Sequence, residues 1–175
     1  MNQPLEKLLQ HQPISQIEWV DARTLNANDY NPNVVLNAEM QLLALSILKT
    51  GWIQPVLITQ EGTIIDGFHR SFLSTNSKEI ISVYNYRVPV VRMNLSEPER
   101  MLLTVRINRA KGSHVAVKMH VLVDKLFREH GYSKQEIAKE IGATMPEIDL
   151  LLKENVFENL GTKNHTYSKA WEPKK

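Results

Sequence analysis

The sequence predicts an α/β (α+β) protein in which a domain with a small mixed sheet is followed by an all-helical domain. Short runs rich in β-branched residues alternate with helical patterns in the first two thirds of the chain, at residues 17–20, 55–59, 63–66 and 88–93. From residue 114 onward apolar residues recur only at helical spacing. A chain of 175 residues has room for about one domain with a small appendage.

Composition excludes several classes of protein. Hydrophobic residues make up 42% of the chain and charged residues 23%, which is ordinary for a globular protein and excludes a wholly disordered one. No apolar run reaches the roughly 18 residues of a membrane span, and the N-terminus has no signal-peptide core, so a cytoplasmic protein is expected. The absence of cysteine excludes disulfides, a thiol nucleophile and cysteine-ligated zinc or iron–sulfur sites.

Four segments are predicted along the chain. Residues 1–16 are polar with two prolines and should form a flexible arm with one turn of helix. Residues 17–112 form the sheet-containing domain, and residues 113–158 form the helical domain. The polar remainder, 159–175, is predicted to be a flexible tail.

The first half of the sheet domain begins with a strand at 17–20. A helix follows from Asn37, a plausible N-cap, to about Thr50, before Gly51. Its buried face is predicted to consist of Leu42, Leu43, Leu45, Ile47 and Leu48. The runs 55–59 and 63–66 should then pair as a hairpin.

The second half of the sheet domain begins at the glycine after this hairpin. Gly67 should break the strand and start a short helix to about Thr75. A strand returns at 88–93, where Pro89 indicates an edge strand or a strand start. Ser96 and Glu99 form a capping box for a helix that ends near residue 112.

The helical domain is predicted to contain three helices. The first presents an apolar face of Val115, Met119, Leu122, Val123, Leu126 and Phe127. Ser133 caps the second, which buries Ile137, Ala138 and Ile141 and ends at Gly142. Thr144 and Glu147 form a capping box for the third, which runs to about Val156. This pattern matches a helix-turn-helix.

The sharpest local motif is Asp66-Gly67-Phe68-His69-Arg70, where an apolar strand meets a helix. Gly67 permits a tight turn, and the free N–H groups of a helix start favour an anion. Arg70 could bind phosphate oxygens through two hydrogen bonds, and His69 could donate to phosphate or transfer a proton. Asp66 could accept from a ribose hydroxyl or help to hold Mg²⁺. The alternative is a turn aspartate, a surface histidine and a helix-end arginine with no ligand.

A second motif is the basic stretch 104–118, which contains no acidic residue. Its potential donors to a di- or triphosphate are Asn108, Arg109, Lys111, Ser113 and His114. Its candidate contacts to DNA phosphates are Arg106, Arg109, Lys111 and Lys118. The alternative is a basic linker between two helices.

These elements and motifs together resemble the ParB/sulfiredoxin superfamily, in particular ParB-like proteins with the partition-protein N-terminal domain. The resemblance runs from about Ile17 to Val156 and rests on IIDGFHR, on INRAKGSH some forty residues later, and on the helix-turn-helix. Asn31-Pro32 and Gln54-Pro55 are further landmarks. Family members bind CTP, ATP or ADP with Mg²⁺. The resemblance places Gly67 and Arg70 on the nucleotide turn, and Asn108 and Arg109 on a second phosphate-facing segment.

Departures from the family's sequence pattern narrow the range of family activities expected for this chain. Sulfiredoxins carry a cysteine where this chain has Phe68, so sulfiredoxin activity is excluded. Ile107 replaces the acidic residue that usually precedes the asparagine in partition proteins, and an apolar side chain cannot help to coordinate Mg²⁺. The DGFHR turn is closer to that of the free serine kinases of the superfamily, in which the aspartate and histidine lie in the active site.

The resemblance implies a nucleotide-binding, DNA-associated regulatory or DNA-maintenance protein. One alternative is an enzyme of the same fold, an ATPase, small-molecule kinase or nuclease that uses Asp66 and His69. A second is a subunit of a DNA-modification or defence complex. The third helix presents Glu147, Asp149 and Glu154 against one lysine, which favours DNA contact with weak sequence specificity. No resident metal site is expected, and both a homodimer and a partner protein remain open.

Overall fold

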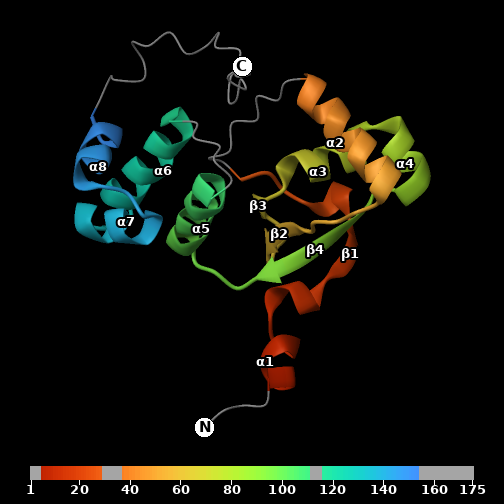
Figure 1. Cartoon of the computed structure of the whole chain (residues 1–175), viewed down its shortest axis with the longest axis horizontal. Coiled ribbons are helices and arrows are strands. Elements are labelled where there is room, and N and C mark those ends of the chain that lie inside the picture. The colour runs from red at the N-terminus through yellow and green to blue at the C-terminus, as the bar shows by residue number, and fades with distance from the viewer. Residues whose placement is uncertain (1–4, 29–36, 111–115, 154–175) are drawn as a thin grey trace, which may run out of the picture. The chain divides into compact units, whose positions relative to one another are not determined.

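A computed structural model describes residues 5–28, 37–110 and 116–153, with only the backbone described for residues 37 and 116–118 (Figure 1). The chain divides into two compact units, Met1–Ile107 and Asn108–Lys175. The predicted boundary between residues 112 and 113 lies outside the described residues, as do Asn31-Pro32 and the tail 159–175.

The first unit is built on a four-stranded sheet with the order β1-β4-β2-β3. The strands are β1 (Glu18–Asp21), β2 (Val56–Thr59), β3 (Ile64–Asp66) and β4 (Arg87–Met93). β4 pairs antiparallel with β1 and parallel with β2, while β2 and β3 form the predicted antiparallel hairpin. The predicted mixed sheet is therefore confirmed.

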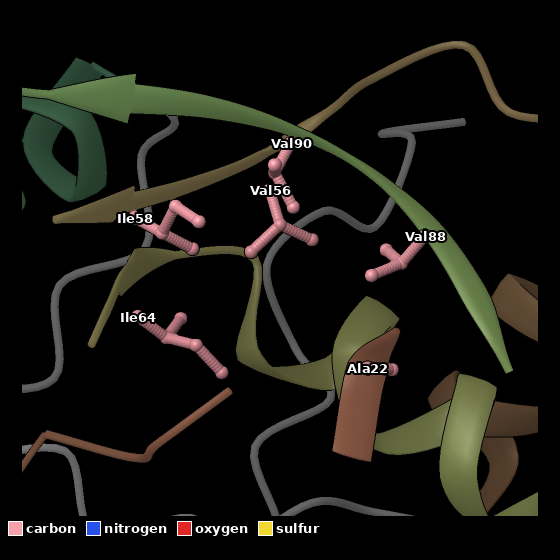
Figure 2. Close-up of a cluster of buried hydrophobic side chains, with 6 residues drawn as sticks. All are labelled: Ala22, Val56, Ile58, Ile64, Val88 and Val90. Atoms are coloured by element: carbon pink, nitrogen blue, oxygen red, sulfur yellow. The ribbon is translucent and has the colours of Figure 1, made fainter. Parts of the chain in front are cut away.

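The sheet core comes from side chains that alternate along β2 and β4. Val56 and Ile58 on β2, and Val88 and Val90 on β4, are completely buried. Figure 2 shows them converging on Ile64 of β3 and on Ala22, with which they form one cluster. Alternate residues of a strand share a face, so the β-branched pattern of these runs produces a continuous apolar surface.

Helices lie in two layers over this sheet (Figure 1). α3 (Phe68–Asn76) and α4 (Lys78–Tyr84) contact the strands, and α2 (Asn37–Thr50) packs on α3 and α4. A second apolar cluster between these helices contains Ile47, Leu73 and Ile80. The unit also contains α1 (Leu5–Gln10), the 3-10 helices Pro13–Gln16 and Ala22–Thr24, and the start of α5 (Glu97–Ala110). The arm thus contains more helix than the single turn predicted for it.

Three expectations for this unit were wrong. α4, which Ser77 caps by accepting a hydrogen bond from the Ile80 N–H, was not predicted. Pro89 lies in an inner strand, since β4 pairs with both β1 and β2; its ladder with β2 begins at Val90, one residue after the proline. The predicted buried face of α2 holds only in part, because Leu42, Leu45 and Leu48 are exposed.

The second unit contains α6 (Ala116–Arg128), α7 (Lys134–Ile141) and α8 (Met145–Leu151), which pack on one another. Ser133 caps α7 as predicted, and the structure adds Glu136 as its reciprocal partner in a capping box. The apolar face of α6 is buried at Met119, Leu122, Val123 and Leu126.

Two details of the helical unit differ from the expectations. Phe127 is 39% exposed and so is not a core residue. α8 ends at Leu151 instead of near residue 156, which lies outside the described residues. At its start Thr144 accepts from the Glu147 N–H, while the Glu147 carboxylate binds Arg109.

Candidate functional site

The turn between β3 and α3 has the geometry that the motif predicts. β3 ends at Asp66, and α3 begins at Phe68. Gly67 between them adopts φ +94° and ψ +22°, a left-handed conformation that favours glycine. Gly67 provides no capping side chain, and the backbone N–H groups of a helix start favour an anion.

Arg70 folds back from the first turn of α3 over Gly67. A Cβ atom on Gly67 would lie 2.9 Å from one terminal nitrogen of Arg70, and 3.2 Å from both Cζ and Nε. These approaches are shorter than ordinary carbon contacts. The backbone conformation therefore favours glycine at this position, and a larger residue would have to displace the guanidinium.

Two acceptors orient the Arg70 guanidinium. One terminal nitrogen donates to Asp66 Oδ2 at 3.1 Å, and the other donates to Gln54 Oε1 at 3.2 Å. The ion pair is largely buried, with side-chain exposures of 11% for Arg70 and 22% for Asp66. Burial lowers the pKa of Arg70 below its ordinary value, and the charge of Asp66 opposes this shift. An arginine pKa is so high that the side chain remains a cation.

Aromatic rings lie beside this turn. Phe68 stacks on Phe72 with 6.2 Å between ring centroids and makes an edge contact with the half-buried His69. Phe68 also packs against the sheet core. The structure thus brings Asp66, Gly67 and Arg70 into contact, and it places His69 at the same helix start.

The second predicted phosphate-binding segment lies at the end of α5 and beyond it. Arg109 donates to Glu147 Oε1 at 2.5 Å and to the Gly142 carbonyl at 3.1 Å, which ties it to the turn between α7 and α8. Asn108 is half-buried and Arg106 is exposed. Outside the described residues lie Lys111, Ser113, His114 and the side chain of Lys118.

The acidic residues of α8 are paired with cations. Glu147 binds Arg109, and Asp149 accepts from Lys134 at 2.6 Å. Glu154 lies outside the described residues. An acidic surface without compensating cations was expected for this helix. That expectation was wrong for Glu147 and Asp149, because a basic side chain pairs with each of them.

Gln54 is the contact that sequence reasoning missed. Its bond to Arg70 joins residues 16 positions apart, just before β2 and on the first turn of α3. Gln54-Pro55 marked the family resemblance, but no sequence pattern links this amide to Arg70. Only the pairing of β2 with β3 brings the two segments together.

The described part of the chain holds no group of three potential metal-ligating side chains. Among the described helices, none has the length and apolar character needed to cross a membrane.

Comparison with known proteins identifies a relative by sequence. The chain is 32% identical over 164 residues to the uncharacterized protein YbdM of Escherichia coli strain K12, covering 91% of this chain and 78% of YbdM. The chain belongs to the YbdM family. No family model matches it.

Comparison with solved structures shows which fold this chain has. The Caulobacter crescentus chromosome-partitioning protein ParB, solved with the centromeric parS site, aligns with a TM-score of 0.54 at 15% identity, covering 83% of this chain and 78% of that one. A pNOB8-like ParB N-domain aligns with a TM-score of 0.50 at 13% identity, covering 77% and 67%. The predicted ParB-like fold is confirmed.

Proposed function

We propose that this chain binds a nucleoside di- or triphosphate at the β3–α3 turn and associates with DNA. The observation that carries the proposal is the Arg70 guanidinium, held by Asp66 and Gln54 over Gly67 at an N-terminus that lacks a capping side chain. A planar cation at a helix N-terminus is suited to phosphate oxygens.

The two acceptors make Arg70 a prepared ligand. Each terminal nitrogen of Arg70 donates one hydrogen bond within the protein. The side chain is therefore oriented before any ligand arrives, and it loses less conformational entropy on binding. Each terminal nitrogen still has a second N–H to offer. Gly67 lets a ligand approach the backbone closely.

The remaining predicted contacts rest on the family resemblance. By it, Asn108, Arg109, Lys111, Ser113 and His114 also contact phosphate. Mg²⁺ would arrive with the nucleotide and neutralise part of its charge. For Arg109 this role requires an exchange, because the side chain already binds Glu147.

Titration with ATP, ADP, CTP and GTP in the presence of Mg²⁺ tests the site directly. Arg70→Lys retains the charge but loses the planar two-point contact, so affinity should fall by about one to two decades, the worth of one charge-assisted hydrogen bond. Arg23→Lys is the matched control: Arg23 also pairs with a nearby aspartate, Asp21, but its side chain is exposed and lies in the 3-10 helix Ala22–Thr24. Unchanged binding by Arg70→Lys would refute the site.

The variant His69→Ala distinguishes a binding module from an enzyme that uses Asp66 and His69. In a binding module, His69→Ala should lose little beyond one hydrogen bond. In an enzyme that uses His69 for proton transfer, the variant should keep nucleotide affinity and lose turnover by about 10²–10⁴-fold. Measuring product formation from the bound nucleotide with the wild-type protein and with His69→Ala distinguishes a binding module from an enzyme.

For DNA association, support comes from the ParB-like fold and from the helices of the second unit. The Caulobacter crescentus protein with this fold was solved on its parS site. We extend DNA association to this chain through α7 and α8 as a helix-turn-helix and through the basic segment with Arg106, Arg109, Lys111 and Lys118. Such binding should weaken steeply with salt and discriminate little among sequences.

The Arg109–Glu147 ion pair provides a sharp test of this association. Glu147→Gln removes a negative charge next to Arg109 and should strengthen DNA binding or leave it unchanged. Asp124→Asn is the matched control, since Asp124 pairs with Arg128 on α6. Replacing Arg106, Arg109 and Lys111 together should weaken binding. A sharp loss with Glu147→Gln alone would contradict phosphate contact by this segment.

A further inference from the structure

The outward face of α2 carries leucines that nothing in the described structure covers. Leu42 is 67% exposed, Leu45 is 48% exposed, and Leu48 beside them is 38% exposed. The opposite face, with Met40, Leu43, Ala44 and Ile47, packs on the cluster formed with α3 and α4. α2 is thus apolar on both sides, although a surface helix normally has one polar side.

The position of α2 in the fold makes this face available to another molecule. α2 lies outside α3 and α4, which separate it from the sheet (Figure 1). Leu42 and Leu45 are one helical turn apart, so they form a short ridge along the helix. Exposed apolar ridges on soluble domains commonly mark interfaces.

We propose that α2 pairs with α2 of a second copy of this chain, antiparallel and about a two-fold axis. In this arrangement Leu42 of each copy packs against Leu45 of the other, so one ridge buries the other. The proposal concerns self-association of the first unit and does not depend on nucleotide or DNA binding.

The charges on α2 favour an antiparallel second copy over other occupants. Glu39 lies in the first turn and Lys49 in the last turn, and both are exposed. Antiparallel pairing brings Glu39 of each copy beside Lys49 of the other. The register that places these two charges opposite each other differs by one residue, about 1.5 Å along the helix, from the register that places Leu42 opposite Leu45. A parallel pair would instead place like charges together.

Molecular mass in solution provides the first test. Sedimentation equilibrium over a range of concentrations should show a dimer for the wild-type protein, and a monomer for Leu42→Glu and Leu45→Glu. Val83→Glu is the control, because Val83 is equally apolar and 62% exposed but lies on α4. Circular dichroism checks that each variant is folded. A monomeric wild-type protein, or a monomeric Val83→Glu variant, overturns the proposal.

A charge exchange tests the geometry independently of the leucines. Glu39→Lys alone and Lys49→Glu alone each place two like-charge contacts in the dimer, so each should dissociate more readily. An equimolar mixture of the two variants should form a heterodimer in which both contacts are attractive. Failure of the mixture to associate more tightly than either variant overturns the antiparallel arrangement.

The absence of cysteine allows a clean cross-linking test. Leu45→Cys should give a covalent dimer with a short bis-maleimide, because both thiols lie near the two-fold axis. Val83→Cys, treated in the same way, should remain a monomer. Equal yields from both variants would indicate random collision and overturn the assignment of α2 as the interface.

Discussion

Gly67→Ala should perturb the first unit in two separable ways. The backbone at Gly67 has φ +94°, so an alanine there incurs a conformational penalty of about 1–2 kcal/mol. Its Cβ would also lie 2.9 Å from a terminal nitrogen of Arg70 and must displace the guanidinium from Asp66 and Gln54. Loss of either bond adds roughly 1.5–3 kcal/mol, the worth of one hydrogen bond to a charged group.

Urea unfolding of the full chain measures this cost as a change in the free energy of unfolding. Gly51→Ala is the matched control in the same unit: its φ is +80°, but its nearest neighbour, the Tyr84 hydroxyl, would be 3.9 Å from the new Cβ. The control should therefore lose only the backbone contribution of about 1–2 kcal/mol. Gly67→Ala should lose more.

A double mutant separates the two contributions. In an Arg70→Ala background the guanidinium is absent, so Gly67→Ala should cost only about as much as Gly51→Ala. If Gly67→Ala costs no more than Gly51→Ala in the wild-type background, the close approach of Arg70 to Gly67 does not constrain that position. The same result would remove the structural basis for Arg70 as a prepared phosphate ligand.

Three further predictions concern capping, packing and pH. Ser133→Ala should cost about 1 kcal/mol and Thr144→Ala less, because only Ser133 has a reciprocal box; equal losses of unfolding free energy would contradict this. Leu126→Ala should cost about 2–5 kcal/mol and the partly exposed Phe127→Ala less, and the reverse order in urea unfolding would place Phe127 in the core. Asp21 has its pKa lowered from 3.8 to about 2, chiefly by hydrogen bonds from Arg23. Its stabilising contribution is thus complete above pH 3.8 and disappears as the pH falls through about 2, so Asp21→Asn should flatten the acid dependence of stability in that window.

Local chemistry determined much of this protein in advance. Gly67 between an apolar strand and a polar helix start predicted the turn, because few other residues tolerate its backbone conformation. Ser133 predicted the start of α7, because an N-cap side chain acts on backbone N–H groups only two or three positions away. The hairpin of β2 and β3 followed from two β-branched runs separated by a short turn.

Tertiary structure decided what depends on partners distant in the sequence. The periodicity of α2 could not show which leucines would be buried, because apolar residues lie on both sides and the positions of α3 and α4 select the inner one. Pro89 suggested an edge, but a strand becomes central through the neighbours it acquires. The hydrogen bonds that Arg70 donates to Gln54 and Arg109 donates to Glu147 join residues 16 and 38 positions apart. Such contacts form when the packing of whole elements brings the side chains together, and that packing depends on the chain as a whole.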